Sequence, residues 1–167
     1  MKPILTISGI TYLIILLTTS ISSAQVVADA NVSANIVTQV SISRIVDMTF
    51  GEIKGTTIAG TVVLTPAETR IATGGVQLVP GKAETATFTI DGQGSYTYSV
   101  TLPSYTMATA AGNTHIIVDN FKSLPAETGS LSDPLTLNVG ATLNVAPDQP
   151  TGHYTSATPF DVIINYN

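Results

Sequence analysis

The last eight residues of the chain carry the pattern that most restricts its fold. In residues 160–167 every second side chain is large and apolar: Phe160, Val162, Ile164 and Tyr166. A period of two residues is typical of a β-strand that buries one face. We therefore expect these four side chains to point inward on the strand that closes the core. Since a domain is typically stable by only about 5–15 kcal/mol, we also expect truncation before Phe160 to unfold it.

The same two-residue period recurs along the chain, whereas an apolar period of 3.6 residues with helix caps does not. Strand patterns follow one another at spacings of about 8–12 residues, which is typical of a β-sandwich. The sequence therefore predicts an all-β, immunoglobulin-like antiparallel β-sandwich of about seven to ten strands.

Three local interpretations accompany this fold class. Residues 135–145 are predicted to form one long strand that bends at Gly140. Residues 86–90 and 96–102 are predicted to pair as a hairpin across a Gly-rich turn. Residues 103–113 are expected to form a loop.

Residues 1–24 have the features of a secretory signal peptide. Lys2 supplies a positive charge, residues 4–17 are mostly apolar, and small residues precede Gln25. The alternative is an uncleaved membrane anchor, but the apolar run is shorter than the roughly 17–25 residues of a spanning helix. We expect cleavage to leave residues 25–167 as a single β-sandwich domain without a membrane span. The protein is then secreted or on the cell surface, after export through the inner membrane and transit of the periplasm.

The composition excludes disulfide bonds and argues against nucleic acid as a partner. The chain has 6 Lys and Arg against 11 Asp and Glu, a net charge of −5 and no Cys. Without Cys there is no disulfide, so burial and strand pairing must hold the fold. Nucleic acid is not an expected partner, because no basic patch occurs.

The residues that carry most enzymatic chemistry are scarce or scattered. His115 and His153 are the only histidines, and a metal site would need further ligands without any Cys. The acidic residues occur singly beside turn residues, and no Gly-x-Ser-x-Gly motif is present. Two carboxylates of a glycosidase need only meet in space, so the sequence leaves that arrangement open. We expect no enzyme activity and no catalytic, cofactor or metal site.

Several motifs resemble a family of secreted bacterial proteins known as domain of unknown function 4402. The resemblance covers nearly all residues after the predicted signal, and it implies no established activity. The motifs that carry it are residues 47–51, 60–66, 73–76, 135–145, 152–154 and 160–167.

A looser resemblance is to fimbrial, pilin-like subunits. These also end in an alternating strand with a penultimate tyrosine, here Tyr166, and a glycine upstream, here Gly152, although their common disulfide is absent. Their alternating N-terminal segment completes the sandwich of a neighbouring subunit by strand addition. The residues that match this segment are Val26, Ala28, Ala30, Val32, Ala34 and Ile36.

Two functional hypotheses follow. The first is a non-catalytic structural or adhesive surface subunit that associates with itself or other surface proteins through its terminal strands. The alternative is a monomeric secreted module that binds a glycan or another surface ligand. Its site would comprise the loop at residues 103–113 with the tyrosines Tyr96, Tyr98, Tyr105 and Tyr154.

Overall fold

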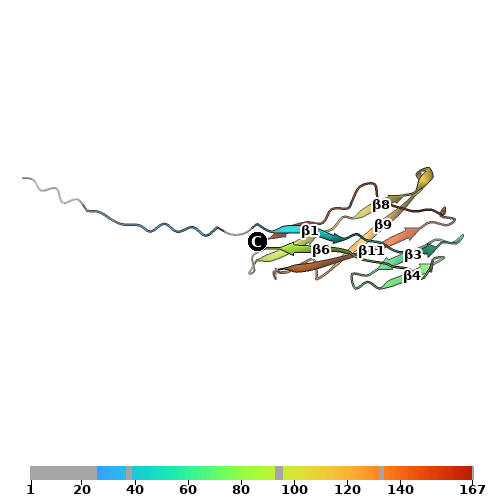
Figure 1. The fold of residues 1–167 in the computed structure, drawn as a ribbon, viewed down its shortest axis with the longest axis horizontal. Helices are drawn as coiled ribbons and strands as arrows, with labels where there is room; N and C mark the ends of the chain where they lie inside the picture. The colour runs from blue at the N-terminus through green and yellow to red at the C-terminus, as the bar shows by residue number, and fades with distance from the viewer. Residues whose placement is uncertain (1–25, 37–38, 93–95, 132–133, 167) are drawn as a thin grey trace, which may run out of the picture. The chain divides into compact units, whose positions relative to one another are not determined.

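The computed structural model describes residues 26–36, 39–92, 96–131 and 134–166 (Figure 1). The predicted signal peptide, residues 1–24, lies outside this described part. The chain divides into two units, Met1–Asn35 and Ile36–Asn167. The described residues of the first unit, 26–35, are all exposed and form no strand or helix.

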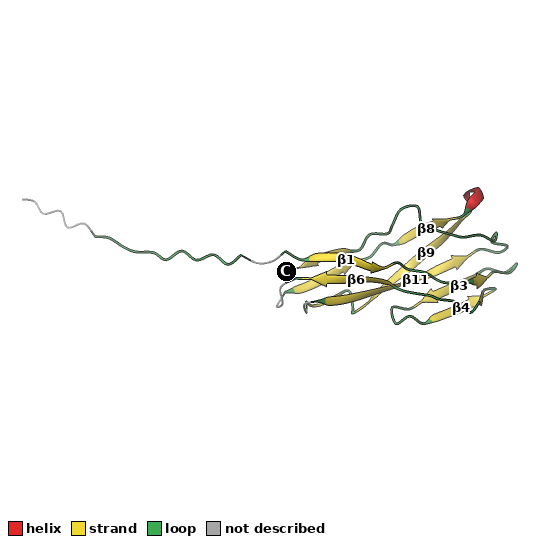
Figure 2. Ribbon diagram, viewed as in Figure 1, coloured by secondary structure: helices red, strands yellow, loops and turns green. Residues whose placement is uncertain are grey.

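The predicted all-β fold, an antiparallel β-sandwich, is confirmed in the second unit (Figure 2). Its described residues form twelve strands and one short 3₁₀ turn, η1 (Ala111–Asn113). The number exceeds seven to ten because three strands contain only two or three residues each. The strands are β1 (Ser41–Val46), β2 (Ile53–Lys54), β3 (Gly60–Leu64), β4 (Arg70–Gly74), β5 (Gln77–Leu78), β6 (Ala86–Asp91), β7 (Thr97–Thr101), β8 (Tyr105–Thr109), β9 (His115–Leu124), β10 (Thr128–Ser130), β11 (Leu135–Val145) and β12 (Ile163–Tyr166).

Strand β11 is the centre of the larger sheet. It pairs with β9 along one side; along the other it pairs first with β6 and then, after Gly140, with β3. Strands β1, β4 and β8 extend this sheet beyond β6, β3 and β9 respectively. The predicted long strand is confirmed, and its register against β9 shifts between Gly140 and Thr142. The inward side chains of β11 are all buried: Leu135, Leu137, Val139, Ala141, Leu143 and Val145.

A smaller sheet of three strands, in the order β10-β7-β12, contributes to the same core. Tyr98 and Val100 on β7 are buried in one cluster with Ile90 on β6 and Leu137 on β11. Core residues thus come from both sheets, and the apolar alternation of each strand supplies them.

The predicted hairpin between β6 and β7 is wrong. Strand β6 pairs with β1 and β11, while β7 pairs with β10 and β12 in the other sheet. Each of the two strands buries one face. The same alternation therefore fits two strands that face each other across the core and two strands that pair within one sheet. The period of two residues specifies which side chains point inward, but it does not specify the pairing partner.

The loop expected at residues 103–113 is also wrong in part. Residues 105–109 form β8, which pairs with β9 at the edge of the larger sheet. Tyr105 and Met107 are exposed on the face that β8 turns to solvent. An edge strand buries little, so its apolar content gave a weaker signal than that of the central strands.

We predict that Gly140→Ala destabilises the fold. A Cβ atom at this position would overlap the carbonyl oxygen of Leu64 and lie 2.7 Å from the carbonyl carbon of Thr65. Since both are backbone atoms, relief requires β3 to move, and we expect a loss of about 1–3 kcal/mol in the free energy of unfolding. Urea denaturation measures the change.

The matched control is Gly55→Ala, in which the new methyl carbon would lie 3.6 Å from Val145 Cγ1, an ordinary contact. We expect a change within about 0.5 kcal/mol for this variant. Equal stability of the two variants would contradict the close approach of β11 and β3 at Gly140.

Candidate functional site

The C-terminal segment lies at an edge of the smaller sheet. Within the described chain, β12 pairs only with β7, from Ile163 opposite Thr101 to Tyr166 opposite Tyr98. Phe160, Val162 and Ile164 are half-buried against the core. The segment therefore contributes to the core from the margin of the sandwich.

The aromatic residues at the two ends of this segment differ in burial. The ring of Phe160 lies 5.0 Å from that of Phe121 and 6.4 Å from that of Phe88, centroid to centroid. Tyr166 differs from the expected inward position, because 42% of it is exposed at the end of the edge strand. Its ring meets Tyr96 edge to face at 6.2 Å.

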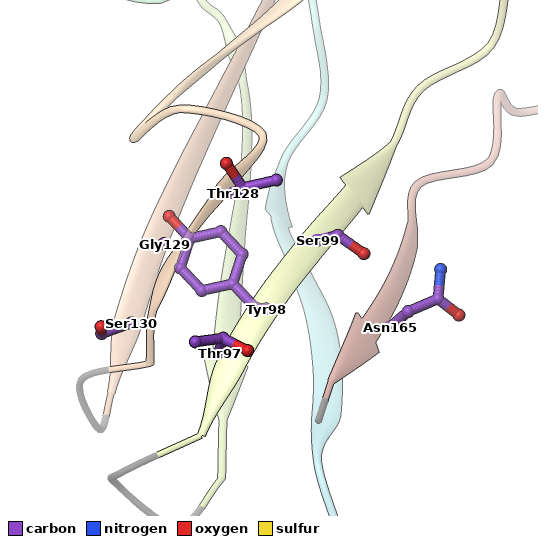
Figure 3. Close-up of a pocket in the computed structure, with 7 residues that line it drawn as sticks. All are labelled: Thr97, Tyr98, Ser99, Thr128, Gly129, Ser130 and Asn165. Atoms are coloured by element: carbon purple, nitrogen blue, oxygen red, sulfur yellow. The ribbon is translucent and has the colours of Figure 1, made fainter.

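Strands β1 and β12 lie on the same side of the sandwich. In Figure 3, β1 in pale cyan passes behind β7 and β12, and Figure 1 places the end of β12 beside the start of β1. Ile42 on β1 is opposite the buried Ile90 and shares its inward face, yet it is 37% exposed. We call this side the β1–β12 seam, defined by Ile42, Val162 and Ile164. Its apolar side chains are only partly covered.

The candidate strand-exchange segment, residues 26–36, forms no strand in the structure. All its side chains are exposed, including Val32 at 96% and Ile36 at 95%. Strand exchange through this segment therefore stays a prediction, and the described residues give the segment no partner strand. The first strand of the second unit is β1.

Of the tyrosines proposed for a glycan site, Tyr98 is buried on β7, and Tyr105 and Tyr154 are not brought together. Tyr105 begins β8 and pairs with Asp119, whereas Tyr154 is next to Thr155, which bridges Thr109 at the other end of β8. The Tyr154 hydroxyl donates to the Pro150 carbonyl oxygen at 2.7 Å and accepts from Gln149 Nε2 at 2.9 Å. Its hydroxyl thus fixes the local loop.

The described residues offer two shallow hollows, and no carboxylate lines either of them. One, of about 440 Å³, lies on β7, β10 and β12 (Figure 3). The ring of Tyr98 packs against Gly129 there, and hydroxyl and amide groups provide the polar lining. The other, of about 610 Å³, includes His115, Asn144 and Gln149. These groups donate and accept hydrogen bonds, but they form no acid–base pair of carboxylates.

His115 and His153 are both exposed, and within the described ranges no three His, Cys, Asp or Glu residues are grouped to hold a metal ion. In the same residues no helix is long and apolar enough to cross a membrane.

We predict that Tyr154→Phe lowers the free energy of unfolding by about 0.5–1.5 kcal/mol, the usual contribution of a hydrogen bond. The variant keeps the ring but removes the donor to Pro150 and the acceptor for Gln149. Tyr105→Phe is the control, because this side chain is 60% exposed. We expect it to change stability by less than about 0.5 kcal/mol in the same urea titration. An equal loss in both variants would contradict the structural role of the Tyr154 hydroxyl.

Among known proteins, the chain matches one family model. A search of curated proteins and a search of solved structures each found no match. A family model described as Domain of unknown function (DUF4402) matches residues 40–166, which include all twelve strands. The match covers well over half of the chain, so the protein belongs to the DUF4402 family.

Proposed function

We propose that the protein is a non-catalytic structural subunit of a bacterial surface, exported by its signal peptide and assembled by strand addition between copies. In this assembly, residues 26–36 of one copy add to a sheet edge of the next. One observation carries the proposal: an exposed segment with the alternation of a strand pairs with no strand among the residues that the structure describes.

The side chains of this segment suit strand addition. Val26, Ala28, Ala30, Val32, Ala34 and Ile36 share one face, and the opposite face carries Asp29, Asn31, Ser33 and Asn35. An added strand needs this division, because one face packs on the core and the other meets water. Complete burial of Val32 and Ile36 would contribute about 1.5–3 kcal/mol each. Their exposure in a single copy leaves this free energy available for assembly.

The composition supports backbone pairing as the bond between copies. The chain has no Cys, so no disulfide links subunits, and only 10% of its residues are charged. Pairing of β-strands between copies needs neither disulfides nor charged side chains, since main-chain hydrogen bonds supply the affinity and alternate side chains supply the fit.

The alternative function, glycan binding by a single copy, has less support. Of the tyrosines proposed for its site, Tyr98 is buried, and Tyr105 and Tyr154 lie at opposite ends of β8. The hydroxyl of Tyr154 already donates a hydrogen bond to Pro150. Glycan recognition at the hollows would depend on hydrogen-bonding side chains without an exposed aromatic platform.

We predict that Val32→Asp combined with Ile36→Asp abolishes self-association of the exported protein. Each carboxylate would have to enter an apolar core, which is costly for an unpaired charge. Because both sites are exposed in the single copy, we expect thermal unfolding to be unchanged. Light scattering coupled to size exclusion, over a range of concentrations, measures the mass.

The matched control is Asn31→Asp combined with Asn35→Asp. It adds the same charge to the same segment, but on the face expected to meet water. We expect these oligomers to persist. A parent protein that stays monomeric at high concentration, or two variants that lose assembly equally, would overturn strand addition by this segment.

A further inference from the structure

The sheet edges of the protein differ in how they are protected against pairing with another chain. In the described residues the larger sheet ends at β1, β4 and β8, and the smaller one ends at β10 and β12. Soluble proteins block such edges with charges, bulges, short strands or covering segments, since an open edge is a template for an added strand. An edge that lacks these features is a candidate acceptor.

Strands β4 and β8 are each covered over part of their edges, and on β8 the covered part is its last residue. The Arg70 guanidinium, at the start of β4, donates to the carbonyl oxygens of Phe50 at 2.9 Å and Val79 at 3.0 Å. These bonds hold the segments around β2 and β5 beside β4, and β5 itself contacts β4. On β8, Thr109 exchanges two backbone hydrogen bonds with Thr155, at 2.8 and 3.1 Å.

Strands β1 and β10 are protected in other ways. The register of β1 against β6 shifts between Arg44 and Val46, as at a β-bulge. Arg44 lies opposite the buried Phe88, so β1 carries a charge at an inward position, in an ion pair with Asp47 at 2.7 Å. Strand β10 has only three residues.

Among the described residues, β12 has no charge, bulge or covering segment, and its short length of four residues is its one protecting feature. Its four residues are Ile163, Ile164, Asn165 and Tyr166, without charge or proline, and its register against β7 is regular. Ile163 and Tyr166 are exposed, and the half-buried Phe160 and Val162 precede the strand. Soluble proteins normally protect an open apolar edge of this kind against pairing with another chain.

Building on the proposed function, we propose that the free edge of β12, at the β1–β12 seam, is the acceptor for residues 26–36 of a second copy. The incoming apolar face covers Ile42, Val162 and Ile164, which the three-stranded sheet leaves partly exposed. Residues 26–36 span about 36 Å when extended, enough to continue past β12 along the whole seam. Their inward side chains are small except at Val32 and Ile36, which suits a seam that is already half filled.

Disulfide trapping tests the acceptor edge. The chain has no Cys, so no native thiol can react with the engineered ones. One copy carries Asn31→Cys, Ser33→Cys or Asn35→Cys, which together sample the unknown register. A second copy, distinguished by a mass tag, carries Asn165→Cys or, in a separate variant, Ile163→Cys. Full-length chains are exported, purified, mixed and oxidised, and heterodimers are read on a non-reducing gel. We expect a covalent heterodimer from at least one donor position with each β12 variant.

The control acceptors are Ile71→Cys on β4 and Met107→Cys on β8, which are about as exposed as Ile163. We expect no heterodimer with them. Heterodimers with these controls in place of β12 would overturn the acceptor while leaving strand addition intact. In a variant whose single chain carries both a donor and an acceptor cysteine, a disulfide within that chain would overturn pairing between copies. Absence of every crosslink in a monomeric protein would overturn the proposed function itself.

Discussion

The fold depends on the pairing of β11 with three other strands. Its six inward side chains are buried, and its backbone bonds to β9 on one side and to β6 and β3 in succession on the other. The change from β6 to β3 occurs at Gly140, where the backbone of residues 64–66 approaches too closely for a side chain. Each further strand of the larger sheet is placed by its register against one of these three neighbours. In a chain without disulfides, this ladder is the main tie between distant segments.

The smaller sheet explains why part of the core stays open. It has three strands, whereas four strands of the larger sheet lie beside one another at the end that includes β1, namely β1, β6, β11 and β9. Three strands leave the margin of the larger sheet partly uncovered, and the result is the seam where Ile42, Val162 and Ile164 meet solvent. The seam is therefore a consequence of strand number and not of a single unusual residue. One added strand, and not a larger side chain, would cover the seam.

Alternation in the sequence specified the inward faces well and the strand partners poorly. The long strand at residues 135–145 and the half-buried Phe160, Val162 and Ile164 follow from the period of two residues. The β6–β7 hairpin was mispredicted because two strands with buried faces satisfy the same pattern across a core. The seam was beyond local reasoning, since Ile42 and Ile164 are far apart in sequence and meet one margin only through the pairing of β1 with β6 and β12 with β7. The exposure of residues 26–36 also has no local signal, because the alternation is the same whether a strand pairs within its chain or with another.

The position of donor and acceptor within one chain determines what strand addition would build. Residues 26–36 precede β1, and the acceptor β12 ends the described chain, so the two surfaces are different and each copy offers one of each. An interface between unlike surfaces is heterologous, and it produces a ring if the rotation closes and an open filament if it does not. A closed two-fold dimer would instead need two reciprocal exchanges in one complex. A single donor and a single acceptor per copy therefore favour head-to-tail growth, in which each subunit covers the seam of its neighbour and leaves its own for the next.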